Sequence, residues 1–348
     1  MKSNRLRARL LGGAVVAGSV AVASMFAAAP AAAATLPSGQ KITIIDQAED
    51  QFYDASPVNG DVTPVGAFGV QIDEYITGVD VNDDGVGYAI ATAYSQEVPD
   101  EDEFPVVFAD GAWLYEANAN TGELTGGVEI FLDFGDVLEE ADYCGAIDYT
   151  NGVVTAACVE EIDEEVFATY VGVVDPATGF MDIFLELNGG SFLFFASIAV
   201  DPISGQLYGF TIEEGDGTFY GVYTLSEDEG ADWVIDTEYP GFGADFDRDG
   251  QLWFTTVEEL QQGEFPFPYP ALATVDLATG GSPFVALYTT PDAEVVDWSE
   301  AITVWGKPAL AATGATVAPV TVAAAAVVLL LGAILAAGTA ARRRKAAA

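Results

Sequence analysis

Two short acidic turns hold the side chains with the clearest capacity for chemistry in this sequence. In each, oxygen-bearing residues alternate along the chain and the run closes on a glycine: Asp245, Asp247 and Asp249 before Gly250, and Asp80, Asn82 and Asp84 before Gly85. Oxygen ligands spaced in this way on a tight turn can converge on Ca²⁺. Neither turn is a complete EF-hand loop, because its twelfth position is Thr256 or Ala91, where a bidentate glutamate is required. Both turns are therefore candidate calcium sites, although a solvated hairpin tip without a metal ion is the favoured interpretation of each.

The other acidic residues do not single out a catalytic pair. They gather in runs, including 100–103, 139–142 and 160–165, and loops of like charge are usually solvated. Two carboxylates could serve a glycoside hydrolase as acid and base, but 54 acidic residues leave too many choices. The chain has no histidine, which excludes Ser-His-Asp and Cys-His nucleophiles and histidine metal triads. We predict a protein that is not an enzyme, with a carboxylate-only carbohydrate-active enzyme as the alternative.

The charge of the chain is unevenly distributed. The full sequence carries 54 acidic and 11 basic residues, a net charge of −43. Eight basic residues lie in the first nine or the last seven positions, so residues 35–313 keep all 54 acids and only Lys41, Arg248 and Lys307, a net charge of −51. A body of this charge cannot neutralise phosphates, which excludes nucleic acid as a direct partner. We expect its extracellular ligand, which the sequence does not identify, to be neutral, cationic or bridged by a metal ion.

The N-terminal segment, residues 1–34, has the three parts of a secretory signal peptide. A basic start precedes a long apolar run, and the run ends in small residues, Ala32 to Ala34, that fit the rule for cleavage before Thr35. We predict a helical signal segment and an exported protein. An uncleaved membrane helix is the alternative.

The C-terminal segment also has three parts. Residues 308–314 form a short linker that contains Leu310-Ala311-Ala312-Thr313-Gly314, residues 315–341 carry no charge for 27 positions, and residues 342–348 begin with four basic residues. A helix over the uncharged part is long enough to cross a hydrocarbon core of ~30 Å. The basic tail would stay on the cytoplasmic side by the positive-inside rule. We therefore predict a transmembrane helix at 315–341.

This tail resembles the cell-wall sorting signal of Gram-positive surface proteins, in the L-A-x-T-G form read by class E sortases of actinobacteria. The resemblance implies that a sortase attacks the Thr313 carbonyl and that Gly314 leaves with the span. Thr313 would then be joined to an amine of a peptidoglycan precursor, which anchors the body to the wall on its extracellular face. The alternative is a single-pass membrane protein with an outward N-terminal body.

Two kinds of turn alternate through the body, residues 35–307. The first follows a short apolar strand and leads to an aromatic strand, and its closing residues are Gly85, Gly152, Gly205 and Gly250. The second resembles Asp-Pro-x-Thr-Gly and closes on Gly60, Gly122, Gly179, Gly230 and Gly280. In such turns Asp, Asn or Ser bonds the backbone two residues on, proline presets φ, and glycine accepts a positive φ.

These turns predict an all-β fold with two hairpins per repeat, which is the size of one four-stranded propeller blade. The glycines of the second series are 50–62 residues apart, so we predict about five blades. The fifth would be composite, with an outer pair from residues 42–65 and an inner strand from 300–304, and would leave no open edge. The strand–Asp–Gly–Tyr rhythm resembles secreted NHL-like repeat propellers. Tandem β-sandwich domains are the alternative.

Two cysteines, Cys144 and Cys158, flank the turn Thr150-Asn151-Gly152. If a three-residue loop pairs Tyr149 with Val153, the cysteines face each other across one hairpin. Outside the cytoplasm such a pair should form a disulfide, with two free buried thiols as the alternative.

The segment 265–270 alternates aromatic residues with three prolines, which remove donors from a central strand, so we expect a loop there. Its rings would pack over the propeller face or grip a sugar or a peptide. Taken together, these patterns predict a wall-anchored propeller that displays a binding or adhesive face. A structural, cation-binding wall component is a further alternative.

Overall fold

The structure is a computed structural model that describes most of the body. The described residues are 35–46, 49–69, 74–97, 106–135, 137–163, 166–188, 193–213, 219–237, 239, 241–262, 265–290 and 301–307. The signal segment 1–34, the pentapeptide Leu310–Gly314, the span 315–341 and the basic tail lie outside them and stay predictions. Among the described residues, no helix has the length and hydropathy needed to cross a membrane.

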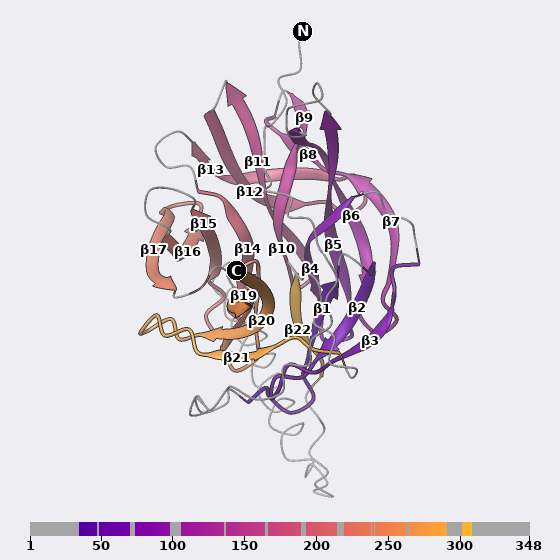
Figure 1. The fold of residues 1–348 in the computed structure, drawn as a ribbon. Coiled ribbons are helices and arrows are strands. Elements are labelled where there is room, and N and C mark those ends of the chain that lie inside the picture. Colours follow the sequence, from indigo (N-terminus) through magenta and orange to yellow (C-terminus); the bar gives the residue numbers. More distant parts are fainter. Residues whose placement is uncertain are drawn as a thin grey trace, which may run out of the picture. The chain divides into compact units, whose positions relative to one another are not determined.

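Five sheets, which we call blades I to V, make up the fold (Figure 1). Blade I runs outward through β4 (Tyr75–Val81), β5 (Val86–Glu97), β6 (Val106–Asn118) and β7 (Glu123–Glu129). Blade II contains β10 (Tyr143–Thr150), β11 (Val153–Asp163), β12 (Val166–Val174) and β13 (Phe180–Asn188), with β8 (Phe131–Asp133) and β9 (Leu138–Glu140) added outside. Blade III contains β14 (Phe195–Val200), β15 (Leu207–Glu213), β16 (Phe219–Ser226) and β17 (Gly230–Thr237). Blade IV contains β18 (Gly243–Phe246), β19 (Leu252–Gln262), β20 (Phe265–Val275) and β21 (Phe284–Leu287). Blade V contains β22 (Ile302–Trp305), β1 (Lys41–Asp46), β2 (Gln51–Ala55) and β3 (Val62–Ala67).

The inner strands of the blades form a closed ring, in which β4, β10, β14, β18 and β22 each pack against the next and β22 returns to β4. The hydrophobic core lies between the blades. Five buried clusters each combine residues of two successive blades, for example Ile90 of blade I with Ile147 of blade II, and Val222 of blade III with Phe254 of blade IV. Each sheet therefore has a neighbour on both faces. This confirms the predicted five-bladed propeller and excludes tandem sandwiches, in which two sheets share one core.

The predicted turn chemistry is present at the blade hairpins. All nine glycines of the two turn series have φ between +71° and +82°. In the turn after β12, the Asp175 carboxylate accepts bonds from the Ala177 amide (3.0 Å) and the Thr178 hydroxyl (2.9 Å). The Asp276 turn repeats these contacts, so short-range side-chain bonding explains why the hairpins recur at this period.

Both ends of the body complete blade V, and β22 and β1 lie side by side (Figure 1). Ile302 pairs with Ile44 and Trp305 with Lys41 across these strands. The composite blade is confirmed with one correction, because residues 41–67 supply three outer strands and not a pair. The predicted interval was long enough for three strands, but the sequence between β1 and β2 contains no glycine to mark a turn.

Cys144 and Cys158 form the predicted disulfide across the hairpin of β10 and β11. The predicted register near the turn is wrong, however, since Thr150 and not Tyr149 pairs with Val153. The loop has two residues, Asn151 and Gly152, both with positive φ. A bulge between Cys144 and Ala146 then shifts the register by one residue and brings the cysteines opposite each other.

The proline-rich segment is a strand, β20, and not the expected loop. Residues 265–275 pair with β19 along their whole length, whereas β21 pairs only with residues 271–273. Prolines at positions 266, 268 and 270 have the strand period of two, so their nitrogens all face the same side. That side is the edge away from β19, where a missing N–H costs no bond to β19.

Candidate functional site

The most concentrated group of buried carboxylates lies on the inner strands, near their ends. Corresponding positions of the five blades hold Asp80, Asp148, Ala199, Asp245 and Thr303. Asp148 is 3 % exposed, and Asp80 and Thr303 are also buried. We call Asp80, Asp148, Asp245 and Thr303 the axial ring.

Each member of the axial ring accepts a hydrogen bond from the next blade. Asp80 accepts one from the Tyr149 amide (2.6 Å), and Asp148 accepts one from the Val200 amide (2.8 Å). The remaining two bonds run from the Val304 amide to Asp245 (2.5 Å) and from the Val81 amide to Thr303 (3.3 Å).

Blade III interrupts this pattern, because the side chain of Ala199 has no hydrogen-bond acceptor for a backbone amide of blade IV. The Phe246 amide donates instead to the carboxylate of Asp245 on its own strand (2.6 Å). The ring thus joins four of the five blade interfaces through side chains.

The three aspartates share one electrostatic environment. Burial raises the pKa of Asp80 well above its ordinary value, and the charges of Asp245 and Asp148 raise it further. Burial also raises the pKa of Asp148 to about 6, against the lowering effect of the Val200 bond. Burial raises the pKa of Asp245 to about 8, against the bond from Val304. Burial and mutual repulsion therefore oppose ionisation of all three carboxyl groups at once.

Thr303 links two of these carboxyl groups directly. Its hydroxyl lies 2.9 Å from Asp80 Oδ1 and 3.4 Å from Asp245 Oδ2. Since one hydroxyl has a single proton, it can donate to one of them at a time. The arrangement can hold and share protons between blades, and its bonds to backbone amides give it a structural role in the ring.

The six predicted calcium ligands do not meet at one point in either turn. Asp247 Oδ1 accepts bonds from the amides of Asp249 and Gln251, and Asp247 Oδ2 accepts one from Trp253 Nε1 (3.0 Å). Asp245, two residues earlier, is directed to Val304 in the axial ring.

The first turn divides in the same way. Asp80 belongs to the axial ring, while Asn82 Oδ1 accepts the Asp84 amide (2.8 Å) within the turn. In the described part of the chain, no three Asp, Glu or Cys side chains are placed to hold a metal ion. Calcium binding stays a prediction.

The three basic residues of the body lie in or contact blade V, where the two ends of the body meet. We call β1, β22 and the residues 306–307 that follow it, with their contacts to blades I and IV, the blade V seam. Lys41 forms an ion pair with Asp54 (2.8 Å) and lies 5.2 Å from the centre of the Trp305 ring. Lys307 forms an ion pair with Asp84, and Arg248 donates to the carbonyl of Gly306.

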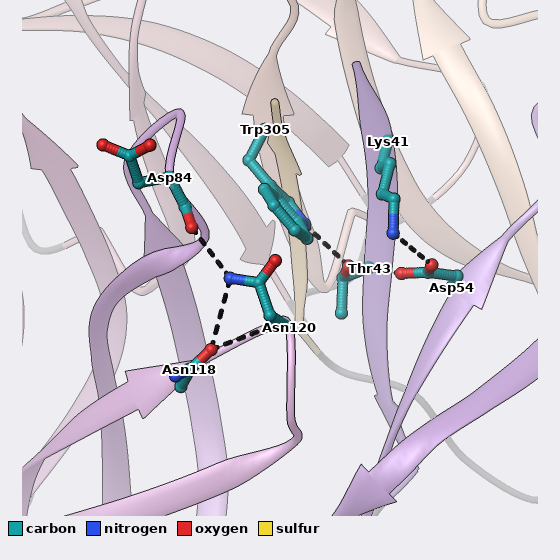
Figure 2. Close-up of polar contacts among 7 residues, drawn as sticks. All are labelled: Lys41, Thr43, Asp54, Asp84, Asn118, Asn120 and Trp305. Carbon is teal, nitrogen blue, oxygen red and sulfur yellow. Dashed lines mark hydrogen bonds and ion pairs between the residues drawn. The ribbon is translucent and has the colours of Figure 1, made fainter. Parts of the chain in front are cut away.

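Trp305 lies at the centre of this seam. Figure 2 shows it between β1, where its indole donates to Thr43 (2.8 Å), and the turns of blade I. In those turns Asn120 donates to the Asp84 carbonyl (2.8 Å) and to Asn118. The predicted ligand Asp84 thus contributes to closure of the ring.

Asp148 and Thr303 are not among the predicted site residues, although the sequence contains a signal for the first. Gly78-Val79-Asp80, Ala146-Ile147-Asp148 and Gly243-Ala244-Asp245 align when the repeats are superposed, and all three aspartates precede a hydrophobic residue. The position of Thr303 becomes visible only after the inner strand of blade V is placed.

No protein-family model and no curated protein matches this chain. Three solved structures with a similar backbone fold come from bacteria. A protein of unknown function from Dyadobacter fermentans is 11% identical, with 74% of this chain and 87% of that chain covered and a TM-score of 0.44. A putative 6-phosphogluconolactonase from Bacteroides fragilis is 9% identical, with 77% and 98% covered and a TM-score of 0.35. The periplasmic gluconolactonase of Pseudomonas aeruginosa is 13% identical, with 72% and 83% covered and a TM-score of 0.35. Similarity this low carries no conclusion about activity.

Proposed function

We propose that this chain is an exported, sortase-anchored surface protein whose propeller displays a binding or adhesive face and performs no catalysis. The observation that carries the proposal is the order of the C-terminal parts: the pentapeptide Leu310–Gly314, then 27 uncharged residues, then four basic ones. Sortase would be a transient partner, the peptidoglycan precursor the acceptor, and the span the membrane contact before processing. The disulfide supports an oxidising compartment outside the cytoplasm.

The axial ring supports a non-enzymatic role. Each of its aspartates uses a carboxylate oxygen to accept a backbone amide of a neighbouring blade. Asp80 and Asp148 are also buried, which limits access of a substrate to them. A glycoside hydrolase needs two accessible carboxyl groups about 5–9 Å apart on either side of the scissile bond.

One observation favours the enzymatic alternative. The pKa of Asp148 is raised to about 6 and that of Asp245 to about 8, and groups with separated pKa values can act as base and acid. A panel of labelled glycans decides between the two functions. Binding without cleavage supports a display protein, whereas turnover that disappears in Asp245→Asn would support the enzyme.

Anchoring is tested by substitution in an actinobacterium that has a class E sortase. The parent chain should stay in the SDS-insoluble wall fraction until a muramidase releases it. The double variant Thr313→Ala/Gly314→Ala should move to the detergent-soluble membrane fraction, and Thr316→Ala, just beyond the pentapeptide, should behave as the parent. If the double variant still resists detergent extraction, sorting at Thr313 is refuted.

A further inference from the structure

The outermost strand of blade II, β9, leaves one side of its backbone open. The order of the sheet is β10-β11-β12-β13-β8-β9, so β9 pairs with β8 on one side, and no strand of the described residues pairs with the other. Among the described strands, those of the other four blades include no such extra hairpin. An open strand edge presents amide and carbonyl groups that can pair with another chain.

The hydrogen bonds around β9 show which residues face this edge. The Phe134 amide donates to the Val137 carbonyl (3.0 Å), and the Ala141 amide donates to the Ile130 carbonyl (3.0 Å). In an antiparallel pair such bonded positions alternate with unbonded ones. Leu138 and Glu140 therefore direct their amide and carbonyl groups away from β8.

Hydrophobic side chains are exposed at the same edge. Val137 is 52 % exposed and Leu138 is 46 % exposed, and Phe134 is exposed beside Tyr170, with ring centres 5.2 Å apart. Large hydrophobic residues on an edge strand are uncommon in monomers, because they favour pairing with another strand.

Carboxylates surround β9 on both faces of the sheet. Burial and the charge of Glu140 raise the pKa of Glu129 on one face. On the other, burial and then the charge of Asp142 raise the pKa of Glu160 to about 8, with Glu139 adding to the effect.

In the part of the chain that the structure describes, the basic residues contact other groups. All three basic residues of the body, Lys41, Arg248 and Lys307, are engaged at the blade V seam. A segment added beside β9 would thus place alternate side chains against acidic groups on either face.

We propose that the outer edge of β9 binds an extended peptide segment with basic side chains, which adds to the blade II sheet as a further strand. Main-chain hydrogen bonds to Leu138 and Glu140 would hold it, and the surrounding carboxylates would select its charge. A second copy of this chain is a poor occupant, because each body has a net charge of −51 and carries glutamates at this edge. This inference does not depend on wall attachment.

The test uses residues 35–313, which contain every strand of the propeller and the seam that closes it. Fluorescence anisotropy measures binding of a labelled eight-residue peptide of alternating Lys and Val. A second peptide has the same sequence with alternate amides N-methylated, so it keeps the charge and loses donors. We expect the unmodified peptide to bind about tenfold more tightly than the N-methylated one, because the N-methylated peptide cannot form all the main-chain hydrogen bonds to β9.

Two variants address the strand itself. Leu138→Pro removes an outward amide and leaves the bonds to β8 intact, and it should weaken binding about tenfold. Glu139→Gln/Glu140→Gln should weaken it about threefold to fivefold, whereas Glu227→Gln/Asp228→Asn, which removes the same charge from an exposed turn of blade III, should not.

The peptide comparison and the charge variants keep the test valid if Leu138→Pro does not fold. Equal binding of the two peptides, or equal loss in the two charge variants, would overturn the proposal in favour of diffuse attraction. So would an absence of binding. Dimers of the parent that Leu138→Pro dissociates would assign the edge to a second copy instead.

Discussion

The buried carboxyl groups of the axial ring make the free energy of unfolding depend on pH. Substitution of Asp148 isolates the contribution of one of these groups. Burial raises the pKa of this carboxyl from 3.8 to about 6, so the folded protein holds a proton that the unfolded chain releases. The stabilisation from this group is complete below pH 4 and is lost as the pH rises through about 6. A pKa difference of one unit between the folded and unfolded states corresponds to about 1.4 kcal/mol. The difference between 3.8 and about 6 therefore amounts to a loss of about 3 kcal/mol at pH 8.

Asp148→Asn keeps an oxygen that can accept the Val200 amide and removes the titration. We expect the variant to be more stable than the parent by about 3 kcal/mol at pH 8 and by about half that at pH 5. Both values of pH lie above the isoelectric point of about 4.1, where the protein stays charged. Urea unfolding followed by tryptophan fluorescence measures the difference.

Acidification also lowers the overall negative charge, and this general effect needs its own control. Asp232→Asn removes one exposed carboxylate on β17 and should change the free energy of unfolding by less than about 0.5 kcal/mol at either pH. If Asp148→Asn shows the same small change at pH 5 and pH 8, or is less stable than the parent at pH 8, the assignment of a buried proton to the axial ring is wrong.

Three further perturbations test the seam, the disulfide and the acidic turns. Gly85→Ala places a Cβ 2.6 Å from the Trp305 ring at φ +74° and should lower the free energy of unfolding, measured by thermal unfolding, by about 2 kcal/mol or more. The control Gly152→Ala has φ +82° and free space around the new Cβ, so it should cost only the backbone strain. Equal losses in the two variants would refute a stabilising role of the Trp305 packing. Replacement of Cys144 and Cys158 by serine should lower the free energy of unfolding by about 3 kcal/mol without reductant, and an unchanged urea midpoint would contradict this. The calcium prediction expects a higher melting temperature of the body in excess Ca²⁺ than in excess chelator, and equal temperatures would leave the acidic turns as ordinary hairpins.

The blade architecture is readable from the sequence because its turns are local. The bond from Thr178 to Asp175 spans three residues, so the composition of a turn is visible in a short window. The disulfide is predicted correctly although the local register is not, because the bulge between Cys144 and Ala146 offsets the shorter turn. A bulge adds one residue without a distinct residue type, so spacing alone cannot place it.

Other features depend on contacts between distant segments. Strand β20 accommodates its prolines because their nitrogens face away from β19, on the edge where β21 pairs only with residues 271–273, and the prolines themselves do not reveal that arrangement. Thr303 meets Asp80 across 223 positions of sequence, and no local pattern reports that contact. The β8–β9 hairpin is equally hidden, since its strands have only three residues each.

The most direct test of the proposed function is the mass of the C-terminal peptide of protein released from purified walls by a muramidase. Sorting predicts a peptide that ends at Thr313 and carries the mass of a wall fragment joined through an amide bond. A peptide that continues through Gly314 into the span, recovered from the membrane fraction, would contradict wall anchoring and leave a single-pass membrane protein.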